Sequence, residues 1–128
     1  LSNYSQLLSG LQLQRGDTLL DFGAGSCWTS RYFAQLGQNV VAMDVSKSAL
    51  EIGKELLHRH PLISPAGELQ FIPYDGHRIP LENNSVDRVV CIDCFHHMPN
   101  PEKIIAEFYR ILKSNGIVGF SEPGPALS

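Results

Sequence analysis

The sequence has few of the features that mark secreted, membrane or nucleic-acid-binding proteins. Its three cysteines are an odd number, which does not suit a disulfide-rich scaffold and predicts free thiols in a reducing compartment. No apolar run approaches the roughly 20 residues that span a bilayer. Lys and Arg total 10 against 13 Asp and Glu, and no basic run is present that could follow a phosphate backbone. We therefore expect a cytoplasmic protein with no nucleic-acid or membrane partner.

The composition is that of one ordinary globular domain, without internal repeats or low-complexity blocks. Hydrophobic residues make up 43% of the 128 residues and charged residues 18%. A chain of this length buries enough surface for a single core, so we treat residues 1–128 as one domain. The chain does not begin with Met and ends at Ser128, shortly after an irregular segment. We therefore expect the domain to be incomplete at its C-terminus.

Short apolar runs alternate with amphipathic stretches, which is the pattern of successive strand–helix–strand units. Strands are predicted at residues 18–22, 39–43, 69–72, 86–92 and 117–120, and helices at 4–11, 27–36, 47–60 and 101–114. Right-handed crossovers then give an α/β fold, a doubly wound, Rossmann-like and mostly parallel sheet with helices on both faces. Ligands bind such sheets at the carboxyl ends of the strands, where the strand order reverses.

Local residues predict where the helices begin and end and which faces they bury. The Ser46 hydroxyl can cap the third helix, and Pro101 suits the first position of the last helix. The third helix is predicted to bury Ala49, Ile52, Leu56 and Leu57. The last helix is predicted to bury Ile104, Ile105, Phe108, Ile111 and Leu112, and to end at Asn115-Gly116.

A glycine turn follows the first predicted strand, in the segment Asp21-Phe22-Gly23-Ala24-Gly25-Ser26-Cys27. Two glycines separated by one residue let the backbone turn sharply and approach a ligand closely. The free amides at the start of the next helix point toward the same place. A turn that only packs a helix against a strand has the same pattern, so the glycines alone do not identify a ligand.

Asp44 ends the second predicted strand, 44 − 21 = 23 residues after Asp21. A carboxylate at this place can accept hydrogen bonds from both hydroxyls of a ribose, and it can also stabilise the start of the next helix. A dinucleotide-binding turn would have a third glycine where Trp28 stands. The bulk of Trp28 argues against a pyrophosphate, although a nicotinamide-dependent oxidoreductase stays an alternative.

Together these segments resemble class I S-adenosylmethionine-dependent methyltransferases, most of all those that act on small molecules. The resemblance is carried by DFGAGSCWTSRYFAQLGQNVVAMDVSKSAL, FIPYDGHRIPLENNSVDRVVCIDCFHHMPNP and RILKSNGIVGFSEP, in the family's order from about Thr18 to Pro123. It implies S-adenosyl-L-methionine as the cofactor and methyl transfer by in-line displacement to a small-molecule acceptor.

The resemblance also implies a role for each residue that matches a family motif. The methionine portion of the cofactor would be bordered by Asp21, Gly23, Ala24, Gly25, Ile92 and Asp93. The ribose would be held by Asp44, and the adenine would contact Val45, Asp75 and Gly76. The family often has a third glycine where Cys27 stands, so this turn is expected to fit its ligand less closely.

No residue pattern identifies a catalytic base, which a sulfonium leaving group does not always require. His96 and His97 follow the fourth predicted strand and are candidates to bind or deprotonate an acceptor, although exposed histidines are the simpler interpretation. With these histidines, Cys91-x-x-Cys94 has a zinc-like spacing. Because no second ligand pair is present, we predict no metal site.

Two further interpretations stay open. Family members usually continue past the fifth strand with a helix and two more strands, which complete the sheet and much of the acceptor pocket. Without that segment, the chain would be a noncatalytic cofactor-binding or interaction module. Alternatively, a partner completes the sheet, and a homo-oligomer is one such case.

Overall fold

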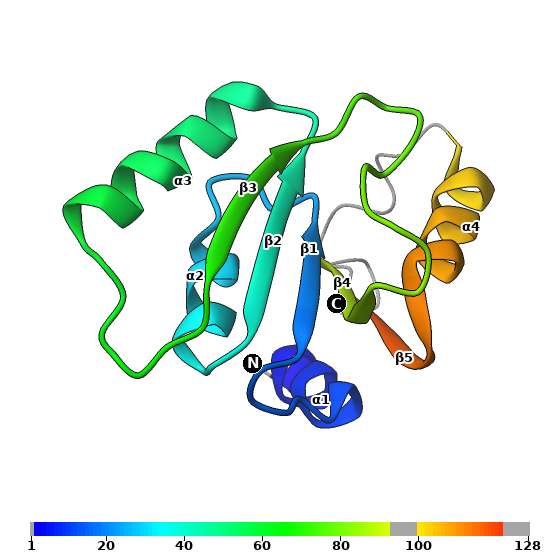
Figure 1. Ribbon diagram of the computed structural model, residues 1–128, viewed down its shortest axis with the longest axis horizontal. Coiled ribbons are helices and arrows are strands. Elements are labelled where there is room, and N and C mark those ends of the chain that lie inside the picture. Colours follow the sequence, from blue (N-terminus) through cyan, green and yellow to red (C-terminus); the bar gives the residue numbers. More distant parts are fainter. Residues whose placement is uncertain (1, 93–99, 122–128) are drawn as a thin grey trace.

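The computed structural model describes residues 2–92 and 100–121, with side chains from residue 7 onward. A five-stranded sheet organises these residues (Figure 1). Its strands are β1 (Thr18–Phe22), β2 (Asn39–Asp44), β3 (Leu69–Pro73), β4 (Val86–Ile92) and β5 (Leu112–Ser121). Their order is β3-β2-β1-β4-β5, and all neighbouring strands are parallel. The predicted doubly wound sheet is confirmed, and the strand order reverses between β1 and β4.

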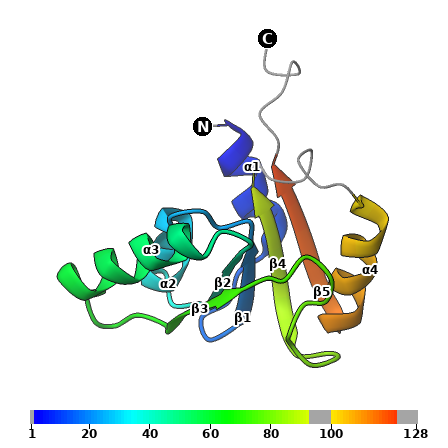
Figure 2. The same cartoon turned by 90° about the horizontal axis from the view of Figure 1, so that it is seen from above.

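In the part of the chain that the structure describes, four helices cover the two faces of the sheet. They are α1 (Ser2–Leu11), α2 (Trp28–Gln35), α3 (Lys47–Arg59) and α4 (Pro101–Ile111). The first three lie on one face and α4 lies on the other (Figure 2). This division follows from right-handed crossovers that run in opposite directions from β1. Within the described residues, no helix combines the length and the apolar character needed to cross a membrane.

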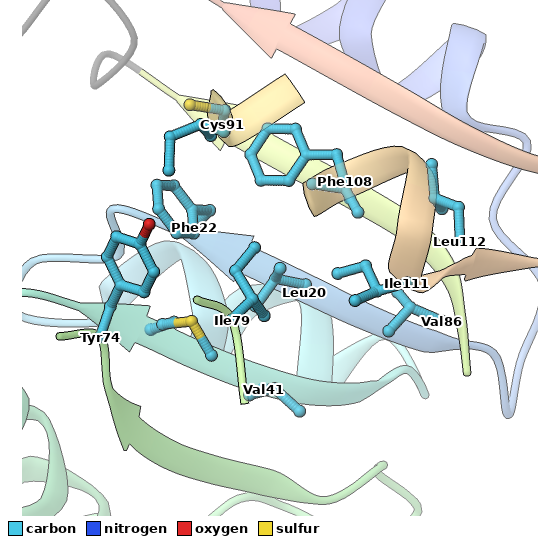
Figure 3. Packing of buried hydrophobic residues seen from close by; sticks show 13 residues of the cluster. Leu20, Phe22, Val41, Tyr74, Ile79, Val86, Cys91, Phe108, Ile111 and Leu112 are labelled. Carbon is cyan, nitrogen blue, oxygen red and sulfur yellow. The ribbon is translucent and has the colours of Figure 1, made fainter. Parts of the chain in front are cut away.

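Alternate residues of β1 enter different hydrophobic clusters because strand side chains alternate between the two faces. Leu19 joins the cluster formed with α1 and α2, whereas Leu20 and Phe22 join the cluster formed with α4. In the α4 cluster, the Phe22 ring lies edge-on to the rings of Tyr74 and Phe108, with centroid distances of 5.1 and 5.3 Å (Figure 3). These rings fill the space directly beneath the carboxyl end of β1.

The predicted buried face of α3 is wrong in part. Leu50 and Gly53 are buried against the sheet, whereas Ile52 and Leu56 are 54% and 43% exposed. The reason is a close approach of α3 to the glycine turn, because a Cβ atom at Gly53 would lie 2.9 Å from the Cys27 Sγ. A rotation that buried the larger apolar residues would lose this contact. The predicted cap is confirmed, since the Ser46 Oγ accepts a hydrogen bond from Ala49 N at 3.1 Å.

The chain also leaves α4 earlier than predicted. Pro101 begins the helix, as expected, but the helix ends at Ile111, and Leu112 already pairs with Val86 of β4. The predicted terminus at Asn115-Gly116 is therefore wrong, because these residues lie within β5 at an irregularity in its pairing with β4. The amide of Ser85 donates to the Ile111 carbonyl at 2.7 Å, so strand pairing replaces helical bonds at this point.

The described cysteines differ in whether their thiol is free or disulfide-bonded. Cys27 is a free and buried thiol, as predicted. Cys91 is disulfide-bonded, so the expectation of free thiols is wrong for this residue. Cys91 is fully buried in the α4 cluster.

Candidate functional site

The carboxyl ends of the parallel strands meet at one edge of the sheet, where most of the predicted site residues gather. The glycine turn follows β1, Asp44 ends β2, and Asp75 comes two residues after β3. Ile92 is the last residue of β4 and is half-buried. The other candidates from the β4 loop, Asp93, His96 and His97, lie outside the described residues.

The glycine turn is attached to β2 and leaves one side open. The amides of Gly23 and Ala24 both donate to the Met43 carbonyl, at 2.8 and 3.0 Å. Gly23 and Gly25 have φ angles of +75° and +60°, which residues with a side chain rarely adopt. A Cβ atom at Gly25 would meet no atom within 4 Å. The backbone therefore borders free space here, as the close approach of a ligand requires.

Asp44 joins three segments of this edge. Its Oδ2 accepts a hydrogen bond from Gly25 N at 2.8 Å, and its Oδ1 accepts one from Ser46 N at 2.9 Å. The Asp44 carbonyl accepts a third from Tyr74 N at 2.9 Å. Because each carboxylate oxygen has two lone pairs, the side chain keeps acceptor capacity for the two hydroxyls of a ribose.

Asp21 is a buried carboxyl group beneath the glycine turn, with 1% of its surface exposed. Its Oδ2 accepts hydrogen bonds from the Thr29 Oγ1 at 3.0 Å and the Ser30 Oγ at 2.6 Å. Burial raises the pKa of Asp21 to about 6, and the two hydroxyl bonds offset only part of this effect. The Asp44 charge raises the pKa further. A positive charge nearby would therefore change the protonation of Asp21.

Asp75 and Val45 follow the paired ends of β3 and β2, where Pro73 lies opposite Asp44. The Asp75 Oδ1 accepts hydrogen bonds from His77 N at 2.8 Å and Arg78 N at 3.1 Å, which lower the pKa of this exposed carboxyl group. Val45 is 66% exposed. An exposed apolar side chain near an ionised carboxylate suits a flat base that carries an amine.

Cys27 occupies the place at which the family often has a third glycine. Its φ angle is +71°, in the left-handed region, and the residue is 3% exposed. Burial raises the pKa of its thiol to about 12, and the Sγ donates to the Gly25 carbonyl at 3.4 Å. Cys27 is therefore a protonated packing residue and no nucleophile at neutral pH.

Sequence reasoning missed two pairs of residues that shape this edge. Thr29 and Ser30 bind Asp21, and their hydroxyls in the first turn of the helix after the glycine turn were a usable signal. Glu107 and Arg110 of α4 hold the segment that follows Asp75, through bonds to Ile79 N at 2.8 Å and Ile79 O at 2.7 Å. Nothing in the local sequence indicates these contacts, because the partners are 28 and 31 residues apart.

The parallel sheet, the glycine turn and the acidic residue at the end of β2 define a domain that binds an adenosine-containing cofactor. A family model described as a methyltransferase domain matches residues 20–120. This match covers most of the chain, so the chain belongs to the S-adenosylmethionine-dependent methyltransferase family.

Individual relatives agree with this assignment. The chain is 34% identical over 104 residues to an uncharacterised chloroplastic methyltransferase of Arabidopsis thaliana, covering 80% of this chain and 30% of that protein. It is 32% identical over 111 residues to a demethylmenaquinone methyltransferase of Renibacterium salmoninarum, covering 84% and 43%. A crystal structure of a SAM-dependent methyltransferase from Aquifex aeolicus has a TM-score of 0.75 at 25% identity, covering 85% and 57%. The chain thus spans less than half of these two curated relatives.

Proposed function

We propose that this chain is the cofactor-binding core of an enzyme that moves a methyl group from S-adenosylmethionine to a small-molecule acceptor by in-line displacement. The observation that carries the proposal is the position of Asp44, which joins the glycine turn to the end of β3 beside an exposed Val45. The name of the Renibacterium salmoninarum relative supports a small acceptor and offers a quinone-type compound as an example.

The described residues fit the parts of this cofactor. Asp44 would accept the ribose hydroxyls, Val45 would pack on the adenine, and Asp75 would accept a hydrogen bond from its exocyclic amine. The open side of Gly25 would border the methionine portion, beside Asp21 and Ile92. Asp93, His96 and His97 stay candidates for the methionine end and the acceptor, on the evidence of sequence alone.

The chain's contribution to such a reaction would be positioning. When bound, the cofactor supplies an activated methyl group on a sulfonium leaving group. The protein then has to hold the acceptor atom about 3 Å from the methyl carbon and exclude water. Asp44 and the turn that contains Asp75 would fix the nucleoside. A general base is needed only for an acceptor that must lose a proton early.

Titration calorimetry with S-adenosylhomocysteine tests the proposal, with NADH as the competing ligand. We expect S-adenosylhomocysteine to bind and NADH not to bind. Replacing Asp44 with Ala should weaken S-adenosylhomocysteine binding by roughly 1–3 kcal/mol, because a half-buried hydrogen-bond partner of the ribose is lost. A matched control is Asp17→Ala, since Asp17 lies in the turn before β1, at the opposite edge of the sheet.

Asp44→Ala also removes the hydrogen bonds to Gly25 and Ser46, so weaker binding by this variant could come from a less stable glycine turn. A second ligand that lacks one ribose hydroxyl distinguishes this effect from the loss of ribose binding. The 2′-deoxy analogue of S-adenosylhomocysteine should bind the unaltered chain more weakly, and Asp44→Ala should bind both ligands alike. Equal affinities of the unaltered chain for the two ligands would show that the ribose is held elsewhere. Cofactor binding without transfer to any acceptor would favour the noncatalytic module.

We also propose a cytoplasmic setting and a small-molecule acceptor in place of a nucleic-acid or membrane partner. The formal net charge of −3 and the lack of a basic run in the sequence support the absence of a nucleic-acid partner, and the cytoplasmic setting rests on the sequence expectation alone. A homo-oligomer stays an open alternative.

A further inference from the structure

The connection between β3 and β4 contains neither helix nor strand over residues 74–85, and α4 holds it in place. Figure 1 shows it in green, running from the end of β3 toward α4. Arg110 donates from Nη2 to the Ile79 carbonyl at 2.7 Å and from Nη1 to the Leu81 carbonyl at 2.9 Å. The Glu107 Oε1 accepts a hydrogen bond from Ile79 N at 2.8 Å. We call Glu107 and Arg110 the α4 clamp.

The two side chains of the α4 clamp also fix each other. Arg110 Nε lies 2.8 Å from the Glu107 Oε2, and Arg110 Nη2 lies 3.0 Å from the Glu107 Oε1. These two hydrogen bonds between the guanidinium group and one carboxylate fix the plane of the guanidinium group. The side chains are only 18% and 14% exposed, and the bond from Arg110 is the largest cause that lowers the pKa of Glu107. Both groups are therefore ionised and oriented at neutral pH.

The α4 clamp binds Ile79, the residue that directly follows the turn that carries Asp75. Residues 75–78 lie between two fixed points. Before them, Tyr74 N donates to the Asp44 carbonyl at 2.9 Å. After them, Ile79 is fully buried and both of its backbone polar groups are bonded to the clamp. The Asp75 carboxylate is thus placed by Asp44 from one side and by the clamp from the other.

We propose that Glu107 and Arg110 are positioning residues for adenine recognition. They hold Ile79 so that the Asp75 carboxylate meets the exocyclic amine of the base, and neither of them contacts the cofactor. This inference rests on the proposed function, because it takes Asp75 as the residue that reads the adenine. A hydrogen bond to a charged group depends on distance and angle, so a shift of the turn weakens this one contact more than the remaining contacts.

The test compares two ligands that differ at one group of the base, S-adenosylhomocysteine and S-inosylhomocysteine. Inosine has a carbonyl oxygen in place of the exocyclic amine, so at that position it presents an acceptor to the Asp75 carboxylate, and the one donor left on this edge of the base is the neighbouring N1–H. We expect the unaltered chain to prefer S-adenosylhomocysteine by roughly 10- to 100-fold, the range for a hydrogen bond to a charged group. In Arg110→Met this preference should fall toward unity, with most of the loss in the affinity for S-adenosylhomocysteine.

The matched control is Arg59→Met, which removes an equivalent pair with Glu55 on the surface of α3. That pair is 2.9 Å long and its side chains are 68% and 56% exposed, so the ligand preference should stay unchanged. Glu107→Gln keeps the side-chain shape and is measured alongside, with an intermediate preference expected. If Arg110→Met does not fold, the reduced preference in Glu107→Gln decides the question.

The possible results separate the inference from the proposed function. A preference that is unchanged in Glu107→Gln and in folded Arg110→Met, with both ligands weakened equally or only the melting temperature lowered, would overturn the positioning role. A chain that binds S-adenosylhomocysteine without any preference over the inosine compound would also overturn it. Failure of the unaltered chain to bind either ligand would instead refute the proposed function.

Discussion

We expect the carboxyl group of Asp21 to make cofactor binding depend on pH. Its pKa is raised to about 6 chiefly by burial, and a cation at the methionine end of the site would lower this value. Near pH 6, about half of the Asp21 carboxyl groups carry a proton, so binding should release up to about half a proton per site. Titration calorimetry of S-adenosylmethionine, which carries the sulfonium cation, in buffers of different ionisation enthalpy measures this release.

Asp21→Asn is the control for this prediction, since it keeps the shape and cannot titrate. The release of protons should disappear in this variant, and its persistence would assign the proton to another group. The same shift has a consequence for stability. The folded chain holds this proton more tightly than the unfolded chain, so Asp21 lowers the free energy of unfolding as pH rises from about 4 to about 6.

Residues that act through their own neighbours in sequence were predictable, and residues that act across the fold were not. The positions of the glycine turn after β1 and of Asp44 at the end of β2 were predicted correctly, because strand ends and turn residues have local signatures. The bond from Ser46 to Ala49 spans three residues and was also found. The α4 clamp reaches back 28 to 31 residues, so its role depends on the packing of α4 against the β3–β4 connection.

At the scale of elements, the contact between α3 and the glycine turn depends on a matched pair of residues. Cys27 fills the space that a third glycine would leave, and its left-handed backbone costs roughly 1–2 kcal/mol. Gly53 then has no room for a side chain, because its Cβ atom would lie 2.9 Å from the Cys27 Cβ. We expect Gly53→Ala to lower the free energy of unfolding by about 1–3 kcal/mol.

In a Cys27→Gly background, the cost of Gly53→Ala should be clearly smaller, although the Ser26 carbonyl, 3.0 Å from the built Cβ atom, keeps part of it. Urea unfolding of the four chains in this double-mutant cycle gives the coupling free energy. Gly10→Ala in α1, where an added Cβ atom meets nothing within 4 Å, is the control and should stabilise the chain. Additive costs of the two substitutions would mean that Cys27 and Gly53 do not compete for space.

The bounds of helices and strands were predicted well where the spacing of apolar residues agreed with the turn residues. The predictions were less accurate where tertiary contacts determine the buried face or the end of an element. β1 and β4 have the predicted bounds, Thr18–Phe22 and Val86–Ile92. For α3, the spacing of apolar residues predicted that Ile52 and Leu56 are buried. Instead Gly53 faces the sheet, because only a residue without a side chain fits against Cys27. For α4, Leu112 continues the helical period, yet its pairing with β4 ends the helix before it.

The two edges of the sheet differ in their roles. One carries the candidate cofactor site, and the other holds α1 against the sheet. The carboxyl edge carries Asp44, Asp75 and the glycine turn, with open space beside the glycines. Near the opposite edge lies Arg88, which is 8% exposed and close to the start of β4. Its Nε donates to the Leu11 carbonyl at 2.5 Å and its Nη2 to the Gln12 carbonyl at 3.1 Å, so it binds the C-terminal end of α1.

This division predicts that stability and cofactor binding can be changed separately. Arg88→Met keeps the apolar stem but leaves the end of α1 without its charged donor, so we expect a loss of about 2–3 kcal/mol in the free energy of unfolding. Faster hydrogen exchange of the α1 amides should accompany it, and Arg59→Met should change the stability by less than about 0.5 kcal/mol. The affinity of folded Arg88→Met for S-adenosylhomocysteine should match that of the unaltered chain, because no contact of the carboxyl edge is altered. A weakened affinity at unchanged stability would show that the two edges are coupled through β4.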